Sequence, residues 1–265
     1  MKKRSLPFYL LAIFFGLFVL FLYGPMITIF ILSLQGPDGT LTFPVRSFGF
    51  YWLGQVFQEQ RVGNFIEPFQ RSIILGAIVT VLAASMSILA AMAFRLRFRG
   101  SSVLFYLTVA SLIVPSILFS FGLGVMFQVL KWPANWLSSG LGAHLTWTLP
   151  IAFLIMLGIF NRFNPYYEEA AKDLGASDVK TFWGIVLPLV APSMVGVSIL
   201  TFTLSYDEFT RTSLVSGQYN TLPLEIFGMT TNVTSPALYA LGTLTTLFSF
   251  SMIAIAYGLY RQLSK

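Results

Sequence analysis

The sequence contains no cysteine and a single histidine, His144. One imidazole, without cysteine or clustered carboxylates beside it, does not indicate a metal site, and we interpret His144 as an interfacial side chain at the outer edge of a membrane helix. The same shortage argues against an intramembrane hydrolase, which needs a nucleophile with a base or a bound metal. We therefore expect no catalytic residue, no metal and no cofactor.

The sequence also contains no Gly-Lys pair, so the phosphate-binding loop G-x-x-x-x-G-K-[ST] is missing. The chain cannot bind ATP through such a loop, and any work derived from ATP must come from a partner. Charged residues make up only 10% of the chain, and its basic residues are not clustered on one soluble face. This distribution argues against a nucleic-acid partner.

Apolar residues, in contrast, are abundant. Hydrophobic residues make up 56% of the 265 positions, and 27 residues are phenylalanine, more than a soluble core of this size can bury. A bilayer core of about 30 Å needs about 20 apolar residues for each helical crossing. The chain is therefore predicted to be an all-α membrane protein forming one transmembrane domain over residues 1–265. The six predicted spans are 8–34, 73–94, 103–130, 142–160, 188–207 and 237–260.

The basic residues predict the orientation, because positively charged loops stay on the cytoplasmic side during insertion. If the N-terminus is cytoplasmic, eleven of the sixteen basic residues are cytoplasmic: Lys2, Lys3, Arg4, Arg95, Arg97, Arg99, Arg162, Lys172, Lys180, Arg261 and Lys265. The opposite side then holds five: Arg46, Arg61, Arg71, Lys131 and Arg211. Both termini and the loop at 162–187 are therefore predicted to be cytoplasmic.

This loop is unusually polar for the chain and has signals for two short helices. Asn164 is a plausible N-cap, and Pro165 at the first helical position loses no hydrogen bond by lacking an N–H. Gly175 can end the first helix in a left-handed conformation, and Ser177 can cap a second helix that runs toward Pro188. The pattern predicts a helix, a sharp corner and a second helix leading into the membrane.

One face of the first predicted helix is small and apolar. Tyr167, Ala170, Ala171 and Leu174 follow helical spacing along it. Because the alanines have little bulk, another protein can approach the backbone closely there, as a docking helix requires. The alternative is an amphipathic segment lying on lipid head groups.

The spacing of this loop resembles the EAA loop of permease subunits of bacterial ABC importers. The residues that carry the resemblance are Glu169, Ala170, Ala171, Gly175, Ile185, Leu187 and Pro188. The resemblance implies a type I ABC importer permease fold in a bacterial inner membrane. It also implies that the first helix of the loop is the coupling helix, which seats in a cleft of a cytoplasmic ATPase subunit.

The same resemblance implies partners and the roles of these residues. An ATPase dimer presents two clefts, so a second, related permease is expected, together with a periplasmic substrate-binding protein. Glu169, Ala170 and Gly175 would make or permit the ATPase contact, and Ile185, Leu187 and Pro188 would anchor the second arm on the membrane core. The bundle itself contacts membrane lipid.

The fifth span is the best place to look for a substrate path. Ser198, Thr201, Ser205 and Glu208 follow steps of three, four and three, so they form one polar stripe that should face protein or a water-filled path. Asp207 lies on a neighbouring face, either as a second path residue or as the partner of Arg211 in an i,i+4 ion pair.

The run from Leu204 to Ser213, followed by Thr221-Leu-Pro-Leu224, resembles spermidine/putrescine-type permeases. Carboxylates at an outer entrance suit a cationic ligand, because each ammonium group then finds an acceptor. Related permeases for iron, sulfate, phosphonates and opine-like compounds share much of this pattern and stay open as alternatives. A stand-alone secondary transporter fits less well, since the acidic groups lie at helix ends and in loops.

Two further features have both a structural and a functional interpretation. The segment 35–69 is long and rich in aromatic residues, as expected either for a surface helix and loop that receive a binding protein or for an interfacial aromatic belt. Its aromatic residues include Phe48, Phe50, Tyr51, Trp52 and Phe57. Pro115 interrupts the third span, and Gly122 and Gly124 follow it. A kink there is either a gating element or a structural feature, and we favour the structural interpretation.

Overall fold

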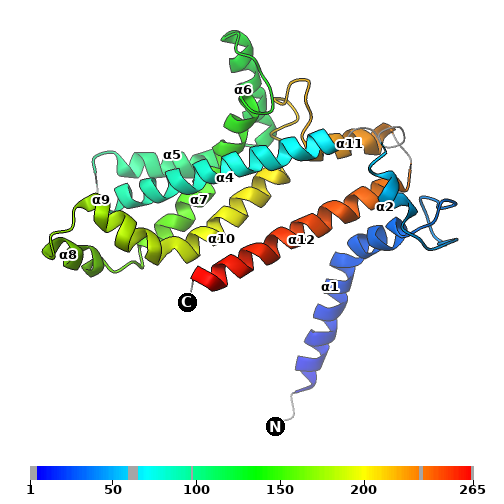
Figure 1. The fold of residues 1–265 in the computed structure, drawn as a ribbon, viewed down its shortest axis with the longest axis horizontal. Helices are drawn as coiled ribbons and strands as arrows, with labels where there is room; N and C mark the ends of the chain where they lie inside the picture. The colour runs from blue at the N-terminus through cyan, green and yellow to red at the C-terminus, as the bar shows by residue number, and fades with distance from the viewer. Residues whose placement is uncertain (1–4, 59–64, 97, 233–234, 264–265) are drawn as a thin grey trace. The chain divides into compact units, whose positions relative to one another are not determined.

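The computed structural model describes residues 5–58, 65–96, 98–232 and 235–263, and its regular elements are helices (Figure 1). The basic residues Lys2, Lys3, Arg4, Arg61, Arg97 and Lys265 lie outside the described residues. The chain divides into two compact units. The first comprises Met1–Phe65 and Gly228–Phe248, and the second comprises Ile66–Phe227 and Ser249–Lys265. The single transmembrane domain stays a prediction.

The first unit is built on α1 (Leu6–Ser33) and the first half of α12 (Ala237–Leu263). The 28 residues of α1 give a rod of about 42 Å, long enough to cross a bilayer. Its apolar side chains are mostly exposed, as expected of a helix that faces lipid or another subunit. Gly242 of α12 allows a close approach, because a Cβ there would lie 3.3 Å from Cγ2 of Ile29.

The connection after α1 is a hydrogen-bonded loop that leads into the short helix α2 (Tyr51–Gln55). The Gln35 side chain donates to the carbonyl of Thr40 and accepts from its N–H, at 2.9 and 3.0 Å. Trp52 is buried and donates from Nε1 to the carbonyl of Gly36 at 2.9 Å. The predicted short helix is therefore present, and Trp52 fixes it to the loop. Phe48, Phe50 and Phe57 are exposed.

The core of the second unit is formed by α4 (Ile66–Arg95), α7 (Ser139–Phe160) and α10 (Leu187–Tyr206), each of which packs against the other two (Figure 1). Ala83, Ala91 and Ala152 are fully buried in the shared core. Small side chains at these positions let the helix backbones approach closely, as is common in membrane bundles. Larger residues, among them Phe153, fill the remaining space.

The helix α4 begins seven residues before the span predicted at 73–94. The prediction began after the charged residues Glu67 and Arg71, but these residues form an i,i+4 ion pair at 3.2 Å within the first turns of the helix. The helix therefore extends beyond its uncharged portion, which is the part that a hydropathy pattern detects.

The third predicted span, 103–130, is not one helix. It consists of α5 (Ser101–Ile113) and α6 (Ser116–Val129), whose axes differ by 105°. Pro115 lacks an N–H and disfavours helical geometry at the preceding residue, and Val114 is extended with φ −65° and ψ 127°. The kink expected at Pro115 is therefore a complete break, and each of the two pieces packs against α7.

The fifth apolar run continues a longer helical rod. The short helix α9 (Asp178–Thr181), the π-helical segment Phe182–Val186 and α10 form one span of 29 residues. A π-helical turn accommodates Pro188, which cannot donate to the regular helical ladder. The next helix, α11 (Leu222–Asn232), follows the segment 207–221. Five helices of the described chain are long and apolar enough to cross a membrane, or six if the bent pair is one span.

Candidate functional site

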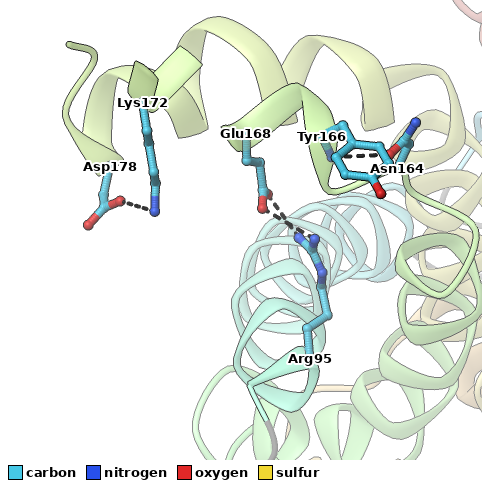
Figure 2. Close-up of polar contacts among 6 residues, drawn as sticks. All are labelled: Arg95, Asn164, Tyr166, Glu168, Lys172 and Asp178. Atoms are coloured by element: carbon cyan, nitrogen blue, oxygen red, sulfur yellow. Dashed lines mark hydrogen bonds and ion pairs between the residues drawn. The ribbon is translucent and has the colours of Figure 1, made fainter. Parts of the chain in front are cut away.

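The candidate site is the elbow formed by α8 (Tyr166–Asp173) and α9. The Asn164 side chain accepts a hydrogen bond from the N–H of Tyr166 at 3.0 Å (Figure 2). The helix begins at Tyr166, so Pro165 has the N-cap position that was predicted for Asn164. At the start of α9, Oγ of Ser177 accepts from the N–H of Lys180 at 3.4 Å. The predicted sequence of helix, corner and helix is therefore present.

Gly175 forms the corner with a φ of +84°, as predicted for the residue that ends the first helix. A Cβ built at this position would meet nothing within 4 Å. Glycine is therefore required by the left-handed backbone and not by lack of space. Gly100, the residue before α5, has the same combination of a positive φ and open surroundings.

The helix α8 presents the motif residues to the outside of the chain. Glu169 and Ala170 are exposed, whereas Ala171 is half-buried. The large apolar side chains on α8 and at its end are also exposed, with Tyr166 at 70% and Leu174 at 89%. An apolar face left open in this way indicates a contact with another protein or with lipid.

Two ion pairs hold the elbow (Figure 2). Glu168 of α8 binds Arg95, the last residue of α4, through two hydrogen bonds of 2.9 and 3.2 Å. Both side chains are largely buried, at 22% and 20% exposure. In the second pair, Nζ of Lys172 on α8 lies 2.8 Å from Oδ1 of Asp178 on α9, and both side chains are exposed. The hydrogen bond and negative charge of Asp178 raise the pKa of Lys172.

A cavity of about 810 Å³ lies between the elbow and the ends of α4 and α7. The members of both ion pairs line it, together with Thr181, whose Oγ1 is buried without a hydrogen-bond partner. The Arg95–Glu168 pair therefore joins α4 and α8 beside a hollow.

The second arm of the elbow enters the core mainly through residues next to those predicted, although Leu187 also packs against the core. Ile185 and Leu187 are half-buried and Pro188 is exposed, whereas Val186 and Val190 are buried in the core cluster. The anchoring role given to Ile185, Leu187 and Pro188 stays a prediction.

The polar residues predicted to form a stripe on the fifth span face protein. This is one of the two environments expected for them, the other being a water-filled path. Thr201, Ser205 and Glu208 are buried, and Ser198 is partly exposed. Thr201 donates to the carbonyl of Val197 within its own helix at 3.0 Å. The path role of these residues stays a prediction, but within this chain the buried members are already engaged in hydrogen bonds.

His144 is not an interfacial side chain, and that expectation was wrong. It is buried, and its two ring nitrogens hydrogen-bond Oγ of Ser205 at 2.7 Å and Oγ1 of Thr212 at 2.8 Å. The imidazole therefore joins α7 to α10 and to the segment after it. Among the residues that the structure describes, no group of three or more His, Cys, Asp or Glu side chains is arranged to hold a metal ion.

The alternative ion pair between Asp207 and Arg211 is not formed. Because α10 ends at Tyr206, these residues do not share a helical face. The Arg211 guanidinium donates to Oγ1 of Thr146 at 2.6 Å and lies over the rings of Phe119 and Trp147.

Glu208 instead closes the turn after α10, where its carboxylate accepts from the N–H of Arg211 at 2.7 Å. Burial raises the pKa of Glu208, and the hydrogen bonds from the N–H groups of Arg211 and Thr210 oppose that shift. Asp207 is exposed, so it is the more accessible of the two carboxylates.

The described helices and the elbow agree with a known family. Residues 83–265 match the model described as "Binding-protein-dependent transport system inner membrane component". The match covers more than half of the chain and includes α7, the elbow, α10 and α12. The chain belongs to this family. It is accordingly a multi-pass inner-membrane transport subunit and not an enzyme.

Curated relatives of this family member span most of its length. It is 30% identical over 244 residues to the spermidine/putrescine transport system permease protein PotC of Haemophilus influenzae, covering 91% of this chain and 93% of that protein. It is 29% identical over 237 residues to the putrescine transport system permease protein PotI of Escherichia coli, covering 84% of this chain and 81% of that protein.

The fold is shared with solved ABC transporters. A chain of a bacterial alginate ABC transporter, solved in complex with an alginate pentasaccharide-bound periplasmic protein, has a TM-score of 0.72 at 15% identity, with coverage of 98% of this chain and 95% of that chain. A chain of the MetNI methionine ABC transporter has a TM-score of 0.60 at 10% identity, covering 74% of this chain and 94% of that chain. These likenesses establish the type of fold.

Sequence reasoning missed one feature of the site, the pairing of Glu168 with Arg95. Glu168 precedes the motif, and Arg95 served only as a signal of orientation. The two residues are separated by 73 positions, so no local pattern reports their contact. An arginine directly after an apolar span and an extra glutamate beside the motif are the only signals that the sequence offers.

Proposed function

We propose that this permease forms half of the translocation path of an ATP-driven importer for spermidine, putrescine or a related polyamine. The observation that carries the importer assignment is the exposed α8 face in a chain of this family. The polyamine assignment is supported by the relatives at 30% and 29% identity, which are named for spermidine/putrescine and putrescine transport.

In this proposal α8 is the coupling helix and lies in the cytoplasm. Among residues 66–227 of the second unit, five described basic residues lie at the α8 end: Arg95, Arg99, Arg162, Lys172 and Lys180. Three lie at the opposite end: Arg71, Lys131 and Arg211. An excess of basic residues on the α8 side favours a cytoplasmic location for that side.

The proposed ATPase contact consists of Glu169, Ala170 and Ala171, with Gly175 shaping the corner. The small side chain of Ala170 lets a cleft close over the α8 backbone, while Tyr166 and Leu174 offer apolar area at the two ends of the helix. Since the chain lacks a phosphate-binding loop, we propose that ATP is hydrolysed by a separate cytoplasmic ATPase dimer. Two clefts require two coupling helices, so we propose a second, related permease as partner.

On the opposite side we propose that a periplasmic binding protein delivers the substrate. In the first unit, α2 and its loop expose Phe48, Phe50 and Phe57, which offer apolar area for that contact. At the outer end of α10, Asp207 offers an exposed carboxylate to an ammonium group. We therefore place Asp207 first among the five path residues.

The test is reconstitution of the full importer in proteoliposomes with its own binding protein and ATPase. We expect ATP-dependent uptake of radiolabelled spermidine or putrescine that requires the binding protein. Uptake of iron, sulfate, a phosphonate or an opine-like compound instead would overturn the polyamine assignment but not the importer assignment. Uptake that persists without any ATPase would overturn the importer and favour a secondary transporter.

A further inference from the structure

The contact between α8 and α4 has the geometry of a directional link. The carboxylate of Glu168 accepts from both Nη atoms of Arg95, at 2.9 and 3.2 Å (Figure 2). Paired, charge-assisted hydrogen bonds of this kind fix the mutual orientation of the two groups as well as their distance. With both side chains largely buried, the pair is screened by water less than an exposed one.

Arg95 is also held by the end of α7. Its guanidinium carbon lies 5.4 Å from the centre of the Phe160 ring and 5.3 Å from that of Phe163. Such cation–π contacts restrict the rotamers available to the arginine. The guanidinium is therefore preorganised for Glu168, and three elements meet at one side chain.

Apart from this pair, α8 packs toward the other arm of the elbow. Its most extensive helix contacts are with α9 and with the π-helical segment that continues into α10. Between α8 and the end of α4 lies the cavity of about 810 Å³. A displacement of α8 therefore has a covalent route into α10, whereas its direct route into α4 passes through Glu168 and Arg95.

The helix α4 has a polar attachment at its opposite end as well. Nε of Arg71 donates to the carbonyl of Asn220 at 2.8 Å, and Oγ of Ser72 accepts from the N–H of Leu222 at 2.8 Å. The 30 residues of α4 form a rod of about 45 Å. One rigid helix thus joins the elbow to the segment between α10 and α11.

We propose that Glu168 and Arg95 are positioning residues for transport, which transmit the motion of α8 into α4 and so to the opposite end of the bundle. The inference rests on the proposed function, because it takes α8 as the element that an ATPase moves. It assigns the neighbouring glutamates different tasks: Glu169 faces the ATPase, and Glu168 faces α4.

The test uses the complete importer in proteoliposomes, with transported substrate and hydrolysed ATP measured together. We expect Glu168→Gln and Arg95→Met to reach the membrane and to assemble with the ATPase, but to lose about tenfold in substrate transported per ATP, the size of a typical coupling between sites. Arg95→Lys keeps the charge without the two-pronged geometry and should be intermediate.

The charge reversal Arg95→Glu with Glu168→Arg tests whether the two residues act as a pair or whether each is needed only for stability. We expect the double variant to regain a substantial part of the transport per ATP that each single reversal loses. The matched control is Asp178→Asn, which breaks the exposed Lys172–Asp178 pair of the same elbow and should leave the ratio unchanged. A ratio unchanged in Glu168→Gln, or no regain in the double reversal, would overturn the proposal.

A further variant, Glu169→Gln, distinguishes a failure of the proposed link from a failure of the proposed function. If Glu169→Gln weakens ATPase assembly while Glu168→Gln leaves both assembly and the ratio intact, the importer stands and the link fails. If the unaltered chain neither retains the ATPase nor shows ATP-driven uptake, the proposed function itself fails.

Discussion

The two ends of the second unit hold the same three helices in different ways. At the outer end of α10, the imidazole of His144 is buried and hydrogen-bonded on both sides, and Glu208 closes a turn inside the chain. At the elbow, the polar side chains line a cavity and meet as ion pairs. A buried side chain with all its polar atoms hydrogen-bonded, as the His144 imidazole is, favours one arrangement, whereas a bridged hollow leaves room for movement.

This difference assigns rigidity and motion to opposite ends of the bundle. Removing a partner at the outer end leaves a polar group unsatisfied in the core, so its effect should appear in stability. Changes at the elbow leave the core intact, so their effect should appear in the coupling of ATP use to uptake. The following variants test that separation, in order of decreasing expected effect.

The largest effect is expected from Gly175→Val at the corner of the elbow. A left-handed conformation costs a residue with a Cβ about 1–2 kcal/mol, and branching at Cβ adds to the strain, so the corner should rearrange and misplace α8. We expect normal insertion in the membrane and a fall of about tenfold or more in uptake per ATP. Uptake and hydrolysis in proteoliposomes measure both quantities.

Gly100→Val is the matched control for this variant. Gly100 also has a positive φ, +89°, and open surroundings, but it precedes α5 and is not part of the elbow. The two substitutions therefore carry a similar backbone cost at different places. Equal losses of coupling in both variants would mean that Gly175 acts through general stability.

At the outer end, His144→Ala is expected to destabilise the protein. The substitution leaves the hydroxyls of Ser205 and Thr212 without their imidazole partner and opens a cavity in the core, at a cost of about 2–4 kcal/mol. Thermal unfolding in detergent should show the loss. The control is Thr108→Ala, which removes an exposed hydroxyl that donates a hydrogen bond to a carbonyl of its own helix. This variant should leave the midpoint of thermal unfolding unchanged. A full loss of coupling with unchanged stability in His144→Ala would reverse the assignment of the two ends.

The same contrast explains what the sequence predicted well. The apolar runs indicated every long helix, and the elbow followed from local signals at Asn164, Gly175 and Ser177, which act within a few residues of themselves. Capping and corner geometry depend on neighbouring backbone atoms, so the sequence contains nearly all the information needed.

What the sequence did not predict depends on contacts between distant segments. The burial of His144 between Ser205 and Thr212 and the pairing of Arg95 with Glu168 join positions that are far apart in the chain. The break at Pro115 was expected as a kink, because proline alone does not determine how far the two pieces turn. The end of α10 at Tyr206 likewise removed the helical register on which the pairing of Asp207 with Arg211 depended.

A smaller effect is expected from Asp207→Asn, which removes the exposed carboxylate at the outer end. An ammonium group loses a charged acceptor but keeps a polar one, so we expect a rise of about fivefold in the KM for polyamine uptake, with assembly unchanged. Glu208→Gln is the comparison, since a glutamine oxygen can still accept from the N–H of Arg211. A larger rise in Glu208→Gln would make Glu208 the path residue.

The pH dependence of uptake tests Asp207 in a second way. Although Asp207 is exposed, neighbouring protein atoms partly desolvate its carboxylate and raise its pKa, so it becomes protonated at a higher pH than an ordinary aspartate as the pH falls. Affinity for a cationic substrate should therefore fall with acidification in the unaltered protein, and this fall should be weaker in Asp207→Asn. Identical profiles of KM against pH in the two proteins would exclude Asp207 from the path.

The smallest effect is expected from the second ion pair of the elbow, Lys172 with Asp178. Both side chains are exposed, and exposed pairs of this kind contribute little. Asp178 raises the pKa of Lys172, so the ammonium group stays protonated well above neutral pH, and the weakness of the pair is due to solvent. We expect Asp178→Asn to leave uptake per ATP unchanged at low and at high salt, in contrast to Glu168→Gln. A loss equal to that of Glu168→Gln would mean that the angle between α8 and α9, and not the link to α4, transmits the motion.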